Sequence, residues 1–382
     1  MADDEEYDAS EPPTSFYEFI ALKPGSSSSS SASSSSGSRP PRDFYFSTVY
    51  PPRPFGSAIA FGGSVLVAAV QAGFCALQQT AGSVEAAEAY QAYSLQGSFT
   101  GPSSVDRSLD LHVQTLRFTR SFATFLVTVS QPDRKGRVRK NMVATFDFVR
   151  PVDSLLRFGP APKDPVSGQP WATPDKLISY YDEIEKRAEE GIRKPQAIAI
   201  ERLAVYGWQD ILEIRLPPES YLAQTLGSLV PTLPTTQDHL APTDKRSSDW
   251  SRYTTPLTRE GIAADKYAAR GMGITPTSAN IAALTHLADT RLAWIPSGTA
   301  KVPLKHLEFT ATLDFSLRYH QRDIRADEWM LREMRSITAG EGRSFGESRF
   351  WDRQGRLLAT MSQQCLLRPH RENDAKAIKL KL

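Results

Sequence analysis

An internal repeat is the feature of this 382-residue sequence that most constrains its fold. The tripeptide Arg-Ser-Phe at residues 120–122 recurs at 343–345, and the turn Asp-Arg-Lys-Gly-Arg at 133–137 recurs as Asp-Arg-Gln-Gly-Arg at 352–356. Each turn separates two segments in which apolar and polar residues alternate, so each copy predicts a β-hairpin with a glycine-bearing loop. Chance similarity of short motifs is the alternative to a duplicated unit.

One long helix is expected upstream of each hairpin. Residues 63–79 form the first apolar candidate, and residues 278–295 form the second, with Thr277 or Ser278 as its N-cap. Two copies of one helix followed by several antiparallel strands would then fill residues 43–150 and 196–370.

The segments outside the two copies differ from them in composition. Residues 1–42 are acidic and then serine-rich, without apolar periodicity, and we expect them to be disordered. Residues 151–195 contain several prolines and then a charged stretch of helical character, which is typical of a connector between domains. Residues 371–382 are a polar tail.

Composition excludes several classes of protein. Lys and Arg total 45 and Asp and Glu total 43, so no basic excess indicates a nucleic-acid partner. The two cysteines, Cys75 and Cys365, lie far apart among apolar neighbours, as expected of reduced thiols in an intracellular protein. The longest apolar run, residues 58–76, is interrupted by glycine, serine and glutamine, and we expect no membrane span.

Sequence motifs for several enzyme classes are also missing. The sequence has no phosphate-binding loop, no Gly-x-Ser-x-Gly elbow and no cluster of His and Cys at metal-ligand spacing. We therefore expect neither a metal ion nor a cofactor.

Two polar residues lie in apolar surroundings. In the strand predicted at 357–367, Gln363 shares a face with apolar side chains; left unpaired, its buried amide would cost about 1 to 3 kcal/mol. Asp289 lies at the margin of the apolar stripe of the second helix. Each residue is either structural or part of a site, where the carboxylate would orient or deprotonate a water molecule.

A strictly alternating segment at residues 308–320 predicts a half-buried strand. Glu308, Thr312 and His320 lie on its polar face, which either contacts solvent or lines a site. The histidines of the chain have no motif context that distinguishes them from structural residues.

These residues together resemble the acyl-CoA thioesterase II family, strongest from residue 280 onward and extending over about residues 44–369. The matching stretches of the second half are 311–320, 325–329, 342–344, 352–357 and 363–368. In the first half, Phe61-Gly62-Gly63, residues 94–102 and residues 120–122 fit the same family. The resemblance implies an α+β double hotdog, with two repeats that each wrap an antiparallel sheet around a long central helix.

The family resemblance implies a catalytic trio at Asp289, Thr312 and Gln363. Such a trio would hold and polarise one water molecule for attack on the thioester carbonyl of a fatty or polyketide-type acyl-CoA, without a covalent intermediate. Backbone N–H groups at a helix N-terminus are the natural donors to the oxyanion. Because strict alternation places Thr312 on the polar face, this assignment requires a β-bulge or a site lined by that face.

Two departures from the family pattern keep other functions open. The usual Gln-Glu-Gly of the last strand reads Gln363-Gln364-Cys365 here, and the usual Asp-His-Ser reads Asp314-Phe315-Ser316. One alternative is a protein that binds acyl thioesters but hydrolyses them poorly. The other is a hotdog hydratase or dehydratase, for which His286 is the helix candidate.

The remaining expectations concern context. The serine-rich segment and the long insertion resemble fungal relatives, some of which act in lipid or secondary-metabolite pathways. The terminal Leu380-Lys381-Leu382 matches a peroxisomal address only in its last two residues, so cytosol and peroxisome are both open. A homo-oligomer is also open, although fused repeats make one chain equivalent to a hotdog dimer.

Overall fold

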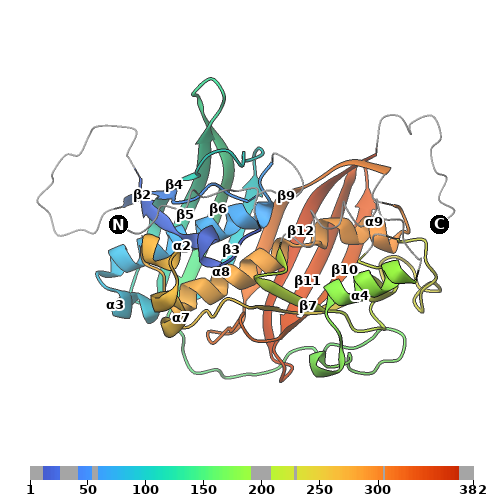
Figure 1. Ribbon diagram of the computed structural model, residues 1–382. Coiled ribbons are helices and arrows are strands. Elements are labelled where there is room, and N and C mark those ends of the chain that lie inside the picture. Colours follow the sequence, from blue (N-terminus) through green and yellow to red (C-terminus); the bar gives the residue numbers. More distant parts are fainter. Residues whose placement is uncertain are drawn as a thin grey trace, which may run out of the picture.

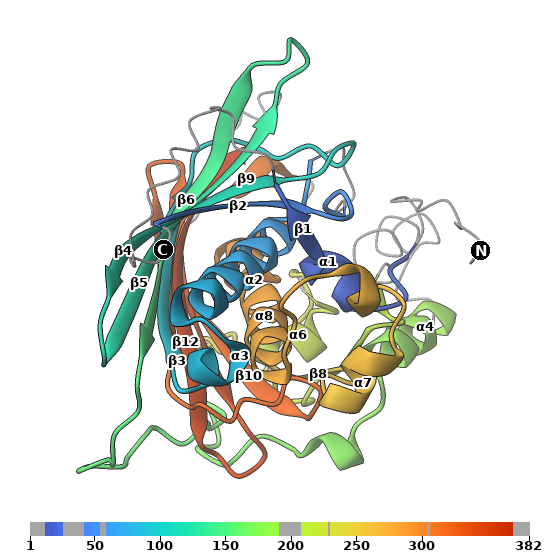
Figure 2. The same cartoon turned by 90° about the vertical axis from the view of Figure 1, so that its left-hand side faces the viewer.

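The computed structural model describes residues 12–25, 42–53, 59–190, 208–227, 230–303 and 306–369. These residues form one twelve-stranded antiparallel sheet, curved around two long helices that lie side by side against its inner face (Figures 1 and 2). The strand order is β1-β2-β4-β5-β6-β3-β9-β12-β11-β10-β8-β7.

The first half of the chain supplies one helix and one side of the sheet. Its elements are β1 (Leu22–Pro24), β2 (Asp43–Thr48), α2 (Gly62–Ala81), α3 (Val84–Glu88), β3 (Gln91–Phe99), β4 (Asp110–Phe118), β5 (Phe122–Pro132) and β6 (Val138–Val149). The repeated turn at residues 133–137 joins β5 to β6, as the hairpin prediction requires.

The second half repeats this arrangement with additional short elements. These are β7 (Leu212–Arg215), α6 (Tyr221–Gln224), β8 (Ser247–Tyr253), α7 (Arg259–Ala264), α8 (Pro276–Asp289), α9 (Ile295–Thr299), β9 (Leu307–Tyr319), β10 (Met330–Gly340), β11 (Arg343–Trp351) and β12 (Leu357–Pro369). Short 3-10 turns lie at Ala268–Arg270 and at Leu292–Trp294. The turn at residues 352–356 joins β11 to β12.

The two halves join at the centre of the sheet. Strands β3 and β9 pair from Ser94 opposite Arg318 to Ser98 opposite Asp314, and α2 packs against α8 on the inner face. The pairing ends at Asp314, while β9 continues for seven residues towards its start at Leu307. Beyond Asp314, strands β3 and β9 are therefore no longer paired, and this opening lies beside the N-terminal end of α2 and the C-terminal end of α8.

Helix α2 forms the centre of the core. All of its residues from Gly63 to Leu77 are buried, because the sheet covers one side of it and α8 and the N-terminal segment cover the others (Figure 2). It ends at Gly82, whose φ of 86° is a left-handed conformation that glycine adopts readily. Among the described residues α2 is the one helix long and apolar enough to cross a membrane, and 83% of its most apolar window is buried inside the fold.

Helix α8 is shorter than the predicted helix at 278–295. It begins two residues earlier, at Pro276, because Thr275 and not the predicted Thr277 or Ser278 is the N-cap, in a reciprocal capping box with Ser278. It ends at Asp289, since Arg291 adopts a left-handed φ of 67° and the chain continues as a 3-10 turn and then α9. Asp289 therefore stands at the C-terminal end of the helix rather than in its middle.

The expectation that residues 1–42 are disordered is wrong for residues 12–25. This segment forms α1 (Tyr17–Ile20) and β1, which pairs with β2 at the edge of the sheet. Phe16, Tyr17 and Ile20 are completely buried. The short apolar run in residues 12–25 packs onto the core although the surrounding sequence is acidic and serine-rich. Tertiary contacts, rather than local periodicity, hold this segment in place. Residues 1–11, 26–41 and 371–382 lie outside the described residues.

The connector between the two halves lies partly on the outer face of the sheet. Residues 160–177 cover a cluster of buried tryptophans that includes Trp171, Trp250 and Trp351. Trp351 donates its indole N–H to the carbonyl of Pro160 at 2.8 Å, and Trp250 donates to Ala172 at 2.8 Å. The charged stretch forms α4 (Tyr180–Glu189).

Candidate active site

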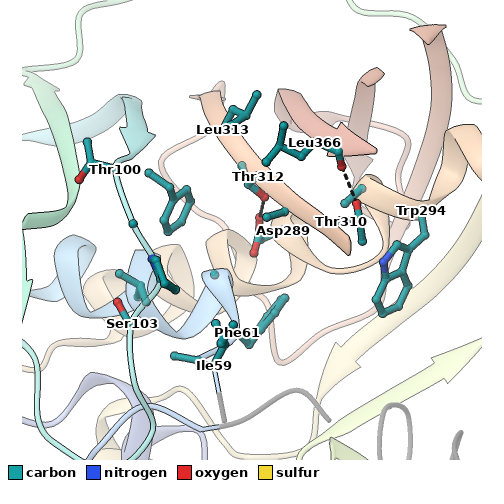
Figure 3. Close-up of a pocket in the computed structure, with 18 of the residues that line it drawn as sticks. Ile59, Phe61, Thr100, Ser103, Asp289, Trp294, Thr310, Thr312, Leu313 and Leu366 are labelled. Atoms are coloured by element: carbon teal, nitrogen blue, oxygen red, sulfur yellow. Dashed lines mark hydrogen bonds between the residues drawn. The ribbon is translucent and has the colours of Figure 1, made fainter. Parts of the chain in front are cut away.

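The structure brings the three predicted site residues together. Asp289 at the end of α8 faces Thr312 of β9 and Gln363 of β12, and Figure 3 shows the aspartate and the threonine at the wall of a cavity. Gln363 Nε2 donates to Asp289 Oδ1 at 2.6 Å and also to Thr312 Oγ1. Thr312 Oγ1 lies 3.4 Å from the same carboxylate oxygen. Both side chains therefore point polar hydrogens at one carboxylate.

Thr312 reaches this position because β9 contains a β-bulge. In the ladder with β12, Gln364 lies opposite Asp314 and Cys365 lies opposite Thr312, so Leu313 is an extra residue. The bulge reverses the alternation of side chains along the strand. Strict alternation had placed Thr312 on the polar face, and that expectation is wrong on the N-terminal side of the bulge.

The N-terminus of α2 closes the other side of the carboxylate. A Cβ atom at Gly62 would lie only 2.6 Å from Asp289 Oδ2, so the helix approaches the aspartate as closely as it does because residue 62 is glycine. The backbone N–H of Gly63 donates to Asp289. Asp289 thus lies between the C-terminal end of its own helix and the positively polarised end of α2.

Burial dominates the protonation of Asp289. The residue is only 6% exposed, and this burial raises the pKa of its carboxyl group to about 6, against the lowering effect of the bonds from Gln363, Thr312 and Gly63. At neutral pH the group is mostly ionised, but its affinity for a proton is higher than that of an ordinary aspartate. Such a carboxylate is suited to take a proton from water.

Gln363 is the most buried member of the group, with 1% of its surface exposed. Its Nε2 has two acceptors, whereas its Oε1 is buried and has no hydrogen-bond partner in the described part of the chain. The amide is therefore oriented by Asp289 and Thr312, and one acceptor remains available. A water molecule that donates to this oxygen would satisfy it.

A cavity of about 500 Å³ opens beside Asp289 and Thr312 (Figure 3). It lies where the β3–β9 pairing has ended. Its wall is mainly apolar, from Phe61, Val65, Phe99, Trp294, Leu313 and Leu366. Thr100, Ser103, Glu308 and Thr310 add polar groups to the lining. The cavity can therefore hold an apolar group against a buried carboxylate.

His286 belongs to a different environment. Its ring lies 4.7 Å from that of Trp208 and 5.2 Å from those of Phe19 and Phe61, and its Nδ1 is 2.7 Å from the Tyr253 hydroxyl. Burial lowers the pKa of His286 to about 3, so the ring is neutral. The residue does not line the cavity, and the structure does not bring it there as a base.

The equivalent position of the first repeat carries no amide. Gln363 is the seventh residue after the turn that ends at Arg356, and the seventh residue after Arg137 is Ala144. The ladders agree, since Gln363 pairs with Gly346 and Ala144 pairs with Val127. The duplicated fold therefore carries this amide on one side only.

Sequence reasoning missed several residues around Asp289. Phe99 and Trp294 line the cavity, and their strands and turns gave no signal beyond apolar character. The N–H contact from Gly63 could have been suspected from the Gly-Gly pair that opens α2. Among the described residues, no group of three or more His, Cys, Asp or Glu side chains is arranged to hold a metal ion.

Fold and site together define the class of protein as a double hotdog. Solved structures with the same fold support this: the acyl-CoA thioesterase II TesB2 from Mycobacterium marinum aligns with a TM-score of 0.57 and 18% identity, over 94% of this chain and all of that one. A protein described as having a hot dog fold, from Alicyclobacillus acidocaldarius, aligns with a TM-score of 0.51 and 16% identity, over 86% of this chain and 94% of that one. The α+β double hotdog prediction is confirmed.

Family models identify the chain more closely. The acyl-CoA thioesterase N-terminal domain matches residues 51–151, and the acyl-CoA thioesterase C-terminal domain matches residues 216–367. The chain belongs to the acyl-CoA thioesterase family, a family of thioester hydrolases. Acyl-coenzyme A thioesterase 8 from Mus musculus is 39% identical over 74 residues, which span 19% of this chain and 23% of the mouse protein.

Proposed function

We propose that this protein hydrolyses an acyl-CoA to a free acid and CoA, with a water molecule activated by Asp289, Thr312 and Gln363. The observation that carries the proposal is the mutual contact of the three side chains, with Asp289 and Thr312 in the wall of one apolar cavity. The apolar wall suits the acyl group of a fatty or polyketide-type substrate. Because the chain belongs to the acyl-CoA thioesterase family, we expect the substrate to be a CoA ester.

In this mechanism Asp289 is the general base. Gln363 Oε1 and the Asp289 carboxylate accept the two hydrogens of the water and direct its oxygen at the thioester carbonyl. The new C–O bond forms as the proton moves to Asp289, and the carbonyl oxygen becomes an oxyanion. Collapse of this intermediate breaks the C–S bond, and the CoA thiolate leaves and takes up a proton.

The N-terminus of α2 is the element that we assign to the oxyanion. Gly62 lines the cavity beside Asp289, and the first N–H groups of a helix have no acceptor within the helix itself. Their partial positive charge would stabilise the developing negative oxygen. Thr312 completes the arrangement by holding the carboxylate through its hydroxyl group.

The test is release of CoA thiol from a panel of acyl-CoAs, from short to long and including aromatic acyl groups. The parent protein is compared with Asp289→Asn, Thr312→Val and Gln363→Ala. Two neighbours give matched controls: Thr310→Val, whose hydroxyl donates to Leu366 O rather than to the trio, and Gln364→Ala, which faces the opposite side of β12.

Three outcomes separate the candidate functions. Turnover by the parent and both controls, with losses of at least about 100-fold in the three site variants, supports the hydrolase. Acyl-CoA binding without thiol release by any form would instead support the protein that only binds thioesters. Exchange of water with an enoyl or hydroxyacyl substrate, without thiol release, would support the hydratase.

A further inference from the structure

A completely buried ion pair lies beneath the end of the helix that carries Asp289. Arg332 of β10 and Asp249 of β8 are direct partners in the ladder, and neither side chain has any exposed surface. Arg332 Nε and Nη2 donate to Asp249 Oδ2 at 3.0 and 2.7 Å. The other carboxylate oxygen, Oδ1, accepts from the Ser251 hydroxyl at 2.5 Å.

The remaining nitrogen of the same guanidinium binds α8. Arg332 Nη1 donates to Leu287 O at 2.7 Å, to Thr290 O at 2.9 Å and to Thr290 Oγ1 at 2.6 Å. These atoms belong to residues on both sides of Asp289 in the sequence. One planar side chain therefore ties the last turn of the helix to two neighbouring strands.

A buried ion pair adds little net stability compared with apolar residues of the same size. Replacing a buried ion pair with apolar residues of similar volume is often neutral or stabilising, because removing two charges from water is expensive. The C-terminal carbonyls of a helix need donors, but Arg332 supplies them from the sheet rather than from the chain itself. The chain reverses at once through Arg291, whose left-handed φ of 67° belongs to this turn.

We propose that the Arg332–Asp249 ion pair positions the carboxylate of Asp289, by holding the last turn of α8 at a fixed height above β8 and β10. The inference rests on the proposed role of Asp289 as general base. Arg332 is thus a positioning residue, and it contacts neither the cavity nor the carboxylate.

The charge of Arg332 does not act directly on Asp289. The groups that face the carboxylate are the N–H of Gly63 from α2, the hydroxyl of Thr312 from β9, and the side chains of Gln363 and Cys365 from β12. Loss of the ion pair would therefore change catalysis through displacement of the carboxylate relative to Thr312 and Gln363. A displacement of about 1 Å at a reacting group can reduce a rate by about 100-fold.

The test compares this pair with an exposed one on the same sheet. Arg332→Met with Asp249→Leu removes the buried pair and keeps side-chain volume. The control is Arg335→Met with Glu347→Gln, because Arg335 Nη2 and Glu347 Oε2 lie 2.7 Å apart on the outer face, with both side chains 31% exposed. For each protein we would measure kcat, KM, the pH profile and the melting temperature.

We expect the buried-pair variant to fold and to lose about 10- to 100-fold in kcat, with KM within about threefold of the parent. The acid limb of its pH profile should also move by at least about half a pH unit, whereas the control keeps the parent's values. A folded buried-pair variant with the parent's kcat and acid limb would overturn the proposal.

Two milder variants test the same role if the double variant does not fold. Arg332→Lys cannot bind both Asp249 and the helix carbonyls in the same way, and Thr290→Val removes one acceptor only. Both should lose about three- to tenfold in kcat without a matching change in melting temperature. Unchanged kcat in both would contradict the positioning role.

One readout works even if no acyl-CoA is hydrolysed. The carbonyl stretch of protonated Asp289, assigned in infrared difference spectra by its loss in Asp289→Asn, reports the titration of that carboxyl group directly. A parent without turnover would remove the proposed function. A shift of the Asp289 titration in the buried-pair variant would still show that Arg332 positions the carboxylate, and an unchanged titration would deny it.

Discussion

Gln363 Nε2 lies 2.6 Å from Asp289 Oδ1, although 74 residues separate the two in the chain. The contact joins the last strand to the end of the second helix, and Thr312 reaches the same carboxylate from a third element. Because the amide donates both to the carboxylate and to the threonine, its orientation is determined, and its free oxygen points elsewhere.

Replacing Gln363 should therefore separate activity from stability. Gln363→Ala removes the acceptor proposed to hold water and should reduce kcat by about 100-fold or more. The fold should survive, since the lost amide leaves a small void and frees Asp289 of one donor. Steady-state thiol release and thermal melting measure the two effects, and Gln364→Ala is the control. Equal rates for Gln363→Ala and Gln364→Ala would rule out the role of the amide.

The pH dependence of activity should follow Asp289. Burial raises the pKa of this carboxyl group to about 6, so the base is protonated and inactive below that value. We expect kcat to rise with pH through an acid limb near pH 6 and then to level off. The limb is measured from initial rates at saturating substrate between pH 4.5 and 8.5. A limb near pH 4 would mean that the carboxylate is better solvated than its burial indicates.

The same pKa predicts how Asp289 contributes to the pH dependence of stability. In the unfolded chain Asp289 titrates near 3.8, so between about pH 4 and 6 this residue binds more protons in the folded state, and its contribution to stability falls as pH rises. The loss is complete above pH 6 and amounts to about 3 kcal/mol at most. Asp289→Asn should abolish it, and should therefore be more stable than the parent at pH 8. Denaturant unfolding at pH 4.5 and pH 8 tests this, and an asparagine variant less stable at pH 8 would contradict it.

Gly62 provides a test of the close approach between the two helices. A Cβ at this position would lie 2.6 Å from Asp289 Oδ2, so Gly62→Ala must displace the carboxylate or the start of α2. We expect kcat to fall at least about tenfold, while the better helix propensity of alanine limits any loss of stability. Gly101→Ala is the matched control, because its Cβ would meet only Lys140 O at 3.9 Å in the same cavity wall. Parent-like rates in Gly62→Ala would show that α2 does not need to approach Asp289 this closely for activity.

The docked N-terminal segment should contribute strongly to stability. Glu18 and Arg53 form an ion pair whose side chains are 1% and 6% exposed. Glu18→Gln removes the negative charge of this buried ion pair and should destabilise the fold by about 3 to 5 kcal/mol. Glu347→Gln, in the exposed pair with Arg335, should cost about 1 kcal/mol or less. Denaturant unfolding measures both, and similar values for the two would contradict the burial argument.

The architecture was predictable because local sequence patterns, namely turn motifs and apolar periodicity, mark the elements of both copies. The turns at 133–137 and 352–356 both form hairpins, and apolar periodicity located α2 almost to its ends. The end of α8 was not predictable in this way. The helix stops before Arg291, whose φ is 67°, and Arg332 binds its last carbonyls from a strand more than 40 positions away.

The candidate site was predictable in part. Gln363 and Asp289 stood out as polar residues beside apolar stripes, and the structure places them in contact. The direction of Thr312 depends on the bulge at Leu313, and a bulge arises from pairing between strands rather than from one strand's own pattern. Docking of residues 12–25 has the same origin, since β1 needs β2 as its partner.

The most direct test of Asp289 as the base that activates water is thiol release from the preferred acyl-CoA at pH 8 by the parent and by Asp289→Asn. At this pH the aspartate is ionised in the parent, and the asparagine keeps the shape of the site without the base. We expect turnover by the parent and a loss of at least about 100-fold in the variant, with both proteins folded. Equal turnover by the two would contradict the assignment of Asp289 as the base that activates water.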